Sequence, residues 1–214
     1  DLKTVPQPQL GGRGPIVPVA RTLGGGSAVN AMVYMRGQKE DYDDWAAQIG
    51  SNHEWSYEDM LGHFRGVESN SKFAGRYHGT GGNLRVSDPG HISQTSDDYL
   101  LAAQALGHPY NPDFNGETQA GVGIMQHTYG LWDGRKRRSD AKKAYLDPLR
   151  DDRRLTIVTG ARVDRIIIEN GRAKPKVVVS QPERRPSRYG WRSSNPEDVP
   201  AFTQIDGAVG STVK

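Results

Sequence analysis

The sequence predicts a chain of α+β character, in which segments with helical spacing of apolar residues precede strand-like runs. The helical segments are 56–67, 96–106 and a short third one after Ser139. The strand-like runs are 155–159 and 162–169, both rich in β-branched residues. With 214 residues the chain is long enough for one ordinary domain.

Local signals define the ends of these elements. Ser56 predicts the start of the first helix, because Asp59 follows at the spacing of a partial capping box. Gly107 predicts the end of the second helix, and Ser139 and Pro148 bracket the third. Asn170-Gly171 is typical of a type I′ turn into a return strand at 177–179, which Pro175 weakens.

Composition excludes several classes of protein. Lys and Arg number 28 against 25 Asp and Glu, so the net charge of +3 does not favour nucleic-acid binding. No apolar run is long enough to span a membrane. The absence of cysteine excludes disulfides, cysteine-ligated zinc and a thiol nucleophile. The low apolar fraction of 35% predicts a lean core.

The candidate binding element is the run Gly24-Gly25-Gly26, next to Ser27 and Asn30. Glycine lets the backbone approach a ligand closely, and the hydroxyl and amide groups can hydrogen-bond to it. The run is not a G-x-G-x-x-G dinucleotide fingerprint, and no strand precedes it. A plain tight turn is therefore the alternative reading.

Further motifs surround this run in a fixed order. Ala20-Arg21-Thr22-Leu23-Gly24-Gly25-Gly26-Ser27-Ala28-Val29-Asn30 is followed by Tyr34, Arg36-Gly37, Asp41-Tyr42-Asp43, Trp45 and Trp55-Ser56-Tyr57. Later come His78-Gly79, Asp113-Phe114-Asn115-Gly116, Gly121-Val122-Gly123, Ala144-Tyr145-Leu146 and Thr159-Gly160-Ala161-Arg162-Val163. Over residues 13–179 the chain thus resembles the glucose–methanol–choline (GMC) oxidoreductases.

The resemblance implies an α/β fold, with part of an FAD-binding domain and part of an antiparallel-sheet substrate domain. It implies an FAD-dependent enzyme that oxidises the alcohol group of a small organic substrate. FAD would be bound non-covalently, because Val29 stands where some members carry a flavin-linked His. The residues that the resemblance assigns to the cofactor are Arg21, Leu23, Gly24, Gly25, Gly26, Ser27, Asn30, Ala31, Met32, Val33 and Val163. For Val163, a buried strand position without a ligand is the alternative.

The chain also departs from the family pattern. No G-x-G-x-x-G motif precedes the glycine run, and Ser180-Gln181-Pro182-Glu183-Arg184-Arg185 does not match the second family signature. The carboxy-terminal catalytic His is missing, and Gly26 stands where Ser or Thr is usual. Together with Asp1 at the start, these departures predict an internal fragment of a longer protein that carries no catalytic residue of its own.

The expected organisation has four segments. Residues 1–52 form an FAD-binding segment, 53–150 the helical and loop part of the substrate-binding region, and 151–179 a hairpin that returns to the FAD domain. Residues 180–214 form a divergent, poorly ordered tail. Two alternatives to an alcohol dehydrogenase or oxidase stay open: an inactive truncated product, and a hydroxynitrile lyase on the same scaffold.

The remaining candidate side chains have structural interpretations. His53, His63 and His91 are expected to be solvated, whereas His78 and His127 are expected to make structural hydrogen bonds. No His pair has metal-ligand spacing, so no metal site is predicted. The acidic run around Asp41, Asp43 and Asp44 predicts the polar side of a helix start, and Arg135-Lys136-Arg137-Arg138 a solvated loop.

Overall fold

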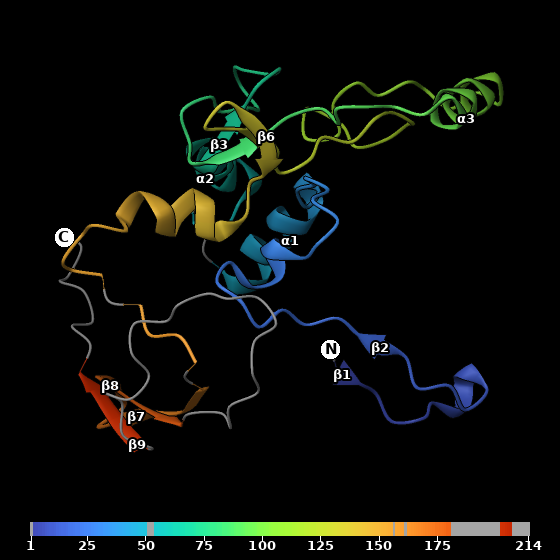
Figure 1. Ribbon diagram of the computed structural model, residues 1–214. Helices are drawn as coiled ribbons and strands as arrows, with labels where there is room; N and C mark the ends of the chain where they lie inside the picture. The colour runs from blue at the N-terminus through green and yellow to red at the C-terminus, as the bar shows by residue number, and fades with distance from the viewer. Residues whose placement is uncertain (1, 51–53, 156, 161, 181–201, 207–214) are drawn as a thin grey trace. The chain divides into compact units, whose positions relative to one another are not determined.

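The computed structural model of the chain describes residues 2–50, 54–155, 157–160, 162–180 and 202–206. The chain divides into two compact units, Asp1–Asp151 and Asp152–Lys214. Figure 1 shows that the first unit holds the helices and several two-stranded sheets, and that the second holds one small sheet. The predicted mixture of helices and strands is confirmed.

Two helices of the first unit pack through aromatic side chains. α1 spans Lys39–Ile49, the helix start that the acidic run predicted, and α2 spans Tyr57–Val67. Ser56 caps α2 by accepting a hydrogen bond from the backbone N–H of Asp59, as the sequence predicted. The ring of Tyr42 on α1 lies edge-on to that of Phe64 on α2, with centroids 5.6 Å apart.

A parallel strand pair follows directly after α2. β3 (Glu68–Asn70) continues from the helix and pairs with β4 (Leu84–Val86). Glycines permit the return of the chain against α2, because a Cβ on Gly79 would lie 1.9 Å from the carbonyl oxygen of Arg65. A Cβ on Gly82 would lie 2.2 Å from the carbonyl carbon of Val67.

An antiparallel hairpin packs beside β4. It consists of β5 (Tyr129–Trp132) and β6 (Arg135–Arg138). The intervening Asp133 and Gly134 both have positive φ, 50° and 71°, as a type I′ turn requires. The expected solvated loop at 135–138 is therefore wrong: these residues form a paired strand.

α3 spans Gln94–Ala105, so it begins two residues before the predicted start. The reason is the cap, because the hydroxyl of Ser93 accepts the hydrogen bond from the backbone N–H of Ser96 at 3.2 Å. Gly107 follows the helix with φ of +91°, in agreement with its predicted role at the helix end.

The third helical segment differs from its prediction. A π-helical turn, η3 (Lys142–Leu146), leads into a 3-10 turn, η4 (Asp147–Leu149). Ser139 does not cap it, since its hydroxyl accepts the N–H of Arg85 at 2.9 Å. The side chain of Asp140 takes that role, accepting the N–H of Lys143 at 2.9 Å. Pro148 lies inside η4, where its missing N–H costs nothing.

The first unit also contains short elements near its start. β1 (Leu2–Lys3) pairs antiparallel with β2 (Ile16–Val17), and η1 (Pro8–Leu10) lies between them. A further 3-10 turn, η2 (Gly25–Ala28), contains part of the glycine run.

The second unit is an antiparallel sheet of order β7 (Arg162–Glu169), β8 (Arg172–Ser180) and β9 (Phe202–Asp206). Asn170 and Gly171 have φ of 52° and 72°, as a type I′ turn requires. The register shifts opposite Pro175, between the pairs Ile166–Val177 and Ile168–Ala173.

Two expectations for this part of the chain need correction. The described residues of the run 155–159 are not in a strand, because no described segment pairs with them. Within the tail expected to lack order, β9 pairs with β8. Residues 181–201 and 207–214 lie outside the described residues, so the expectation for them stays a prediction.

The buried residues confirm that the core is lean. Buried apolar residues include few large side chains, and polar residues are buried in at least equal number. The buried apolar set is Ala46, Tyr57, Leu61, Val86, Ala103, Phe114 and Ala144. Stability of the first unit therefore depends strongly on how well its buried polar groups are paired.

Candidate functional site

The three consecutive glycines of the candidate loop differ in backbone conformation and in the space around them. Gly24 and Gly25 have φ of +92° and +54°, a region that side-chain-bearing residues rarely adopt. A Cβ on Gly24 would also lie 3.3 Å from Oδ1 of Asp140. A Cβ on Gly25 or Gly26 would meet nothing within 4 Å. The backbone at 25–26 is thus open to a ligand, whereas Gly24 packs against the protein.

The hydroxyl of Ser27 is used to hold this loop. It donates a hydrogen bond to the carbonyl oxygen of Gly24 at 2.5 Å and accepts one from the backbone N–H of Ala141 at 2.9 Å. Since a hydroxyl has one hydrogen, Ser27 can offer a ligand only an acceptor. Its main role is to fix the conformation of the glycine run.

A side chain that the sequence analysis missed fixes the same loop from β6. Nη1 of Arg138 donates to the carbonyl oxygens of Ser27 at 3.2 Å and Asn30 at 2.8 Å, and to Oδ1 of Asn30 at 2.6 Å. Arg138 is half-buried, whereas the rest of its basic run is exposed. The hairpin dipeptide Asp133-Gly134 was the available signal, because it places Arg138 at a strand end.

The Asn30–Val33 segment is held in a strained conformation. Met32 has φ of +64°, which is unusual for a residue with a long side chain. Its N–H is bound by Oδ1 of Asn30 at 3.1 Å, and its carbonyl oxygen accepts the N–H of Thr128 at 2.7 Å. Val33 forms an antiparallel bridge with His127. In the described part of the chain no acceptor binds Nδ2 of Asn30, so this amide remains a free donor.

The predicted cofactor residues fall into two groups. Ten of them lie in the first unit, within the single segment 21–33, which is largely exposed or half-buried. Val163 lies on β7 in the second unit. It is 56% exposed, so the alternative reading as a buried strand residue is wrong. Its assignment to the cofactor stays a prediction.

Next to this segment lies a buried polar network. Nη2 of Arg36 is 2.7 Å from Oε2 of Glu68, whose side chain is fully buried. Both ring nitrogens of His78 are bound, Nδ1 to Oε1 of Glu68 at 3.0 Å and Nε2 to Oδ2 of Asp113 at 2.8 Å. The side chain of Asn115 accepts the N–H of Arg36 at 2.8 Å. The expected structural role of His78 is confirmed.

The charges of this network support one another. Burial alone lowers the pKa of His78, but its hydrogen bonds to Asp113 and Glu68 outweigh burial and raise it to about 9. Burial raises the pKa values of Glu68 and Asp113, but hydrogen bonds from His78 and other donors bring both below their usual values. Near neutral pH the network therefore holds two cations and two carboxylates.

Of the other histidines, some match their expected environment and one does not. His63 and His91 are exposed, as expected, and His53 lies outside the described residues. The expected hydrogen bond of the His127 side chain is wrong: its buried Nδ1 has no partner among the described residues. Its backbone instead binds that of Ser87 in both directions.

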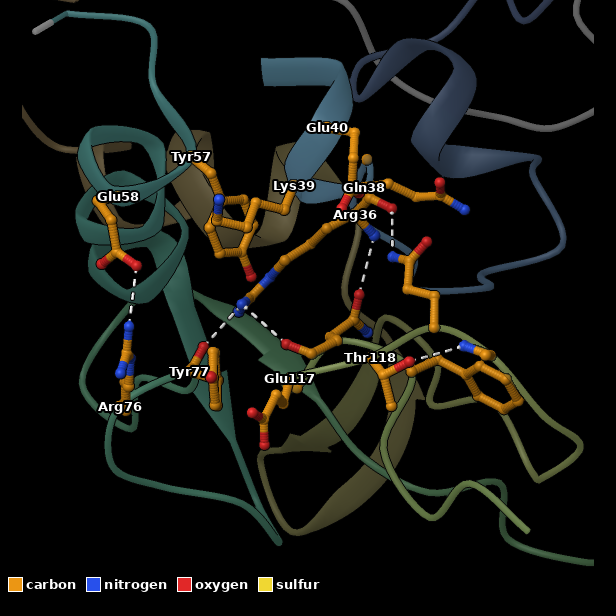
Figure 2. Close-up of a pocket in the computed structure, with 16 residues that line it drawn as sticks. Arg36, Gln38, Lys39, Glu40, Tyr57, Glu58, Arg76, Tyr77, Glu117 and Thr118 are labelled. Carbon is orange, nitrogen blue, oxygen red and sulfur yellow. Dashed lines mark hydrogen bonds and ion pairs between the residues drawn. The ribbon is translucent and has the colours of Figure 1, made fainter. Parts of the chain in front are cut away.

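One cavity, of about 650 Å³, lies between the starts of α1 and α2 and the segments 76–77 and 114–120 (Figure 2). Some of its polar groups are paired with each other. Glu58 binds Arg76 at 2.9 Å, and Nη1 of Arg36 donates to the carbonyl oxygen of Tyr77 at 2.7 Å. None of its lining residues belongs to the segment 21–33. The cavity thus gives no reason to move the candidate site away from the glycine run.

Among the described residues no group of His, Asp and Glu has the arrangement of a metal site. None of the described helices is both long and apolar enough to cross a membrane.

A strained, rigidly held glycine-rich segment with an open backbone face is typical of proteins that bind a cofactor at a loop. The sequence model of the GMC oxidoreductases matches residues 8–188, most of the chain. The chain belongs to the GMC oxidoreductase family. The match extends past residue 180, where the sequence analysis placed the start of the divergent tail.

Curated relatives agree with this assignment. An alcohol dehydrogenase [acceptor] of Pseudomonas putida is 36% identical over 173 residues, which cover 80% of this chain and 30% of the relative. An oxygen-dependent choline dehydrogenase of Stenotrophomonas maltophilia (strain K279a) is 37% identical over 176 residues, with the same shares. The chain thus spans 30% of the length of these relatives.

Solved structures show the same fold. Pyridoxine 4-oxidase from Mesorbium loti matches with a TM-score of 0.78 and 26% identity, over 96% of this chain and 36% of that one. An FAD-dependent oxidoreductase from Chaetomium thermophilum matches with a TM-score of 0.79 over 97% of this chain and 34% of that one. At 24% identity this second likeness concerns the fold alone.

Proposed function

We propose that this chain is part of an FAD-dependent oxidoreductase that oxidises the CH–OH group of a small alcohol. The family and the relatives named alcohol dehydrogenase and choline dehydrogenase support this proposal. The observation that carries it is the segment 24–33, whose backbone is open at Gly25 and Gly26 and whose Asn30 amide is a free donor. The partner is a small-molecule alcohol and no nucleic acid.

The segment fits a planar cofactor on chemical grounds. Positions without a Cβ let the backbone lie close to a ring, and the amide of Asn30 can donate to a ring or ribityl acceptor. Binding would be non-covalent, because Val29 has no nucleophile and its side chain is 57% exposed. The residues that would hold FAD are Arg21, Leu23, Gly24, Gly25, Gly26, Ser27, Asn30, Ala31, Met32, Val33 and Val163.

The chain's own residues would contribute position rather than proton transfer. FAD, when bound, supplies the electron acceptor for the alcohol C–H bond. Arg138 and Ser27 keep the loop in one conformation, which lowers the entropy lost when a ligand binds. Both ring nitrogens of His78 are bound to carboxylates, so this His is not available as a base. We assign no catalytic base to this chain.

The proposal extends to the organisation of the chain. Residues 1–52 would belong to the FAD-binding domain and 53–150 to the substrate-binding region, including part of its antiparallel sheet. Residues 151–179 would return to the FAD domain. In that position Val163 would lie beside the adenine end of FAD. The compact units divide at Asp151 and Asp152, close to the second of these boundaries.

Titration of the 214-residue chain with FAD, followed by quenching of flavin fluorescence, tests the proposal. The informative variant is Asn30→Asp, which keeps the acceptor for Arg138 and Met32 but removes the amide donor. Loss of one hydrogen bond of about 1 kcal/mol weakens binding roughly fivefold. Gln48→Ala, at an exposed position of α1, is the matched control and should bind as the parent does. Equal affinity of parent and Asn30→Asp would contradict the assignment of this amide to the cofactor.

A further inference from the structure

A second cavity, of about 580 Å³, lies on the part of the first unit formed by β3, β4, β5 and β6. None of its lining residues belongs to the segment 21–33 that the proposed function uses. Its charged lining residues are Arg85 from β4 and Lys136 from β6. No Asp or Glu lines it, so its charge is not compensated from within.

Arg85 is held in place before any ligand binds. Its backbone N–H donates to the hydroxyl of Ser139 at 2.9 Å. Its aliphatic stem crosses Gly130, where an added Cβ would lie 2.6 Å from Cβ of Arg85. Its guanidinium carbon lies 4.2 Å from the centroid of the Trp132 ring. The side chain is therefore fixed by packing on both the stem and the charged group.

The guanidinium of Arg85 nevertheless has no hydrogen-bond acceptor among the described residues. The other arginines withdrawn from solvent do: Arg36 binds Glu68, and Arg138 binds Asn30. A guanidinium offers five donors, and no nitrogen of Arg85 is among the buried unpaired atoms, so its donors stay accessible. A ligand in the cavity can therefore supply the acceptor.

Two further groups of the cavity lack a partner in the same way. Nε1 of Trp132 is buried and has no acceptor among the described residues. Lys136 forms no ion pair with a described carboxylate and lies 5.9 Å from the centroid of the Tyr129 ring. Two cationic side chains, Arg85 and Lys136, thus line one cavity that contains no acid, and the buried indole N–H of Trp132 does not open onto it.

We propose that this cavity is a binding site for a small oxyanion, a carboxylate or a phosphate, separate from the proposed cofactor segment. The planar guanidinium of Arg85 suits an oxyanion because two of its N–H groups can bind two oxygens at once. The ammonium of Lys136 supplies further donors. Val86, Leu131 and Ala144 form an apolar part of the wall that can take an organic remainder of the ligand.

Thermal unfolding of the full 214-residue chain in increasing inorganic phosphate tests the site, with chloride at equal ionic strength as reference. We expect a saturable rise in Tm for the parent. Arg85→Gln should weaken phosphate binding at least tenfold, because hydrogen bonds to charged groups are the strong ones. Lys136→Gln should weaken it less. Arg135→Gln is the matched control, since it removes the same charge from an exposed position of β6 outside the cavity.

A second variant covers the case in which Arg85→Gln lowers the stability of the protein without phosphate. Arg85→Lys keeps the positive charge and most of the aliphatic stem but removes the planar pair of N–H groups, so it should weaken phosphate binding severalfold. Unchanged phosphate binding in both variants, or an equal loss in Arg135→Gln, would overturn the site. Displacement of phosphate by FAD would show that the site is not separate from the cofactor site, and would assign these donors to the cofactor.

Discussion

Gly25 combines two properties that decide what a substitution there does. Its φ is +54°, and a Cβ would project into open space beside the loop. We expect Gly25→Val to remove measurable FAD binding, because a branched side chain occupies the space a ring needs and also disfavours this φ by about 1–2 kcal/mol. The measurement is the flavin content of the purified variant after incubation with FAD.

Gly26 supplies the matched control for this substitution. Its Cβ direction is equally open but its φ is not in the left-handed region. Gly26→Ser should therefore lower the flavin content less than Gly25→Val, because a small side chain at this position adds no backbone strain. Unchanged flavin content in Gly25→Val would show that the open face at residue 25 is not the cofactor side.

At this scale the sequence singles out the segment 24–26 but not the structural reason for each glycine. The run 24–26 is predicted as a place of close approach. In the structure Gly24 is packed and has positive φ, Gly25 is open and has positive φ, and Gly26 is open without positive φ. Arg138 is missed because its contacts join positions 27 and 138, and no local pattern reports such a separation.

At the scale of elements, the buried network joins α2–β3, the segment 76–79 and the loop 113–116, and it makes stability depend on pH. The pKa of His78 is raised from 6.5 to about 9, so its contribution is complete below 6.5 and is lost as the pH rises through 9. The pKa values of Glu68 and Asp113 are lowered, so their contributions are present above the usual carboxyl range and lost on acidification.

We expect His78→Gln to lower the free energy of unfolding by about 3 kcal/mol near pH 6, since it leaves buried carboxylates without their cation. The variant should also lose the decline in stability between pH 6.5 and 9. Urea unfolding at low protein concentration at several pH values measures both effects. His91→Gln, at an exposed position, should behave as the parent. An alkaline decline of equal size in His78→Gln would assign the pH dependence to another group.

Elements with local end signals are predictable, and elements that depend on distant partners are not. Ser56 and Asp59 define the start of α2, and Asn170-Gly171 defines the turn between β7 and β8. The run 155–159 has strand-like composition, but a strand needs a neighbour, and none of the described strands pairs with it. Only tertiary context decides such a case.

α3 and the residue after it expose large apolar side chains to solvent. Tyr99 is 68% exposed, Leu101 65% and Leu106, directly after the helix, 81%. Exposed apolar patches of several hundred Å² are sites of association or aggregation. We expect the 214-residue chain to self-associate at elevated concentration, as measured by light scattering. The double variant Leu101→Glu/Leu106→Glu should reduce it, whereas a parent that stays monomeric at the same concentration would contradict the expectation.

At the scale of the whole molecule, the family and the position of the candidate loop follow from the sequence, because ordered motifs over residues 13–179 identify them. The geometry of the polar network does not follow. Arg36, Glu68, His78 and Asp113 come from four separate segments, and their pairing depends on how those segments pack. The same holds for Arg85 and Trp132, whose contact joins β4 to β5.

The last prediction is that the 214-residue chain by itself oxidises no alcohol, even with added FAD. Hydride transfer needs a held flavin, a base within about 2.6–3.2 Å of the substrate hydroxyl and a shaped pocket. No G-x-G-x-x-G cradle for the cofactor phosphates occurs in this sequence, and both ring nitrogens of His78 are occupied. Loss of a general base costs about 10²–10⁴-fold in rate, whereas weak cofactor binding removes the electron acceptor itself. The second effect therefore decides the outcome.

Dye-linked oxidation of a panel of primary alcohols, with FAD in excess, measures this directly. Turnover should stay at the level of FAD without protein. Activity that co-purifies with the chain and disappears in Gly25→Val would contradict the prediction, because it would require both a bound flavin and a working base among residues of this chain. Activity that persists in Gly25→Val would instead indicate a contaminating enzyme, since that variant is expected to remove measurable FAD binding.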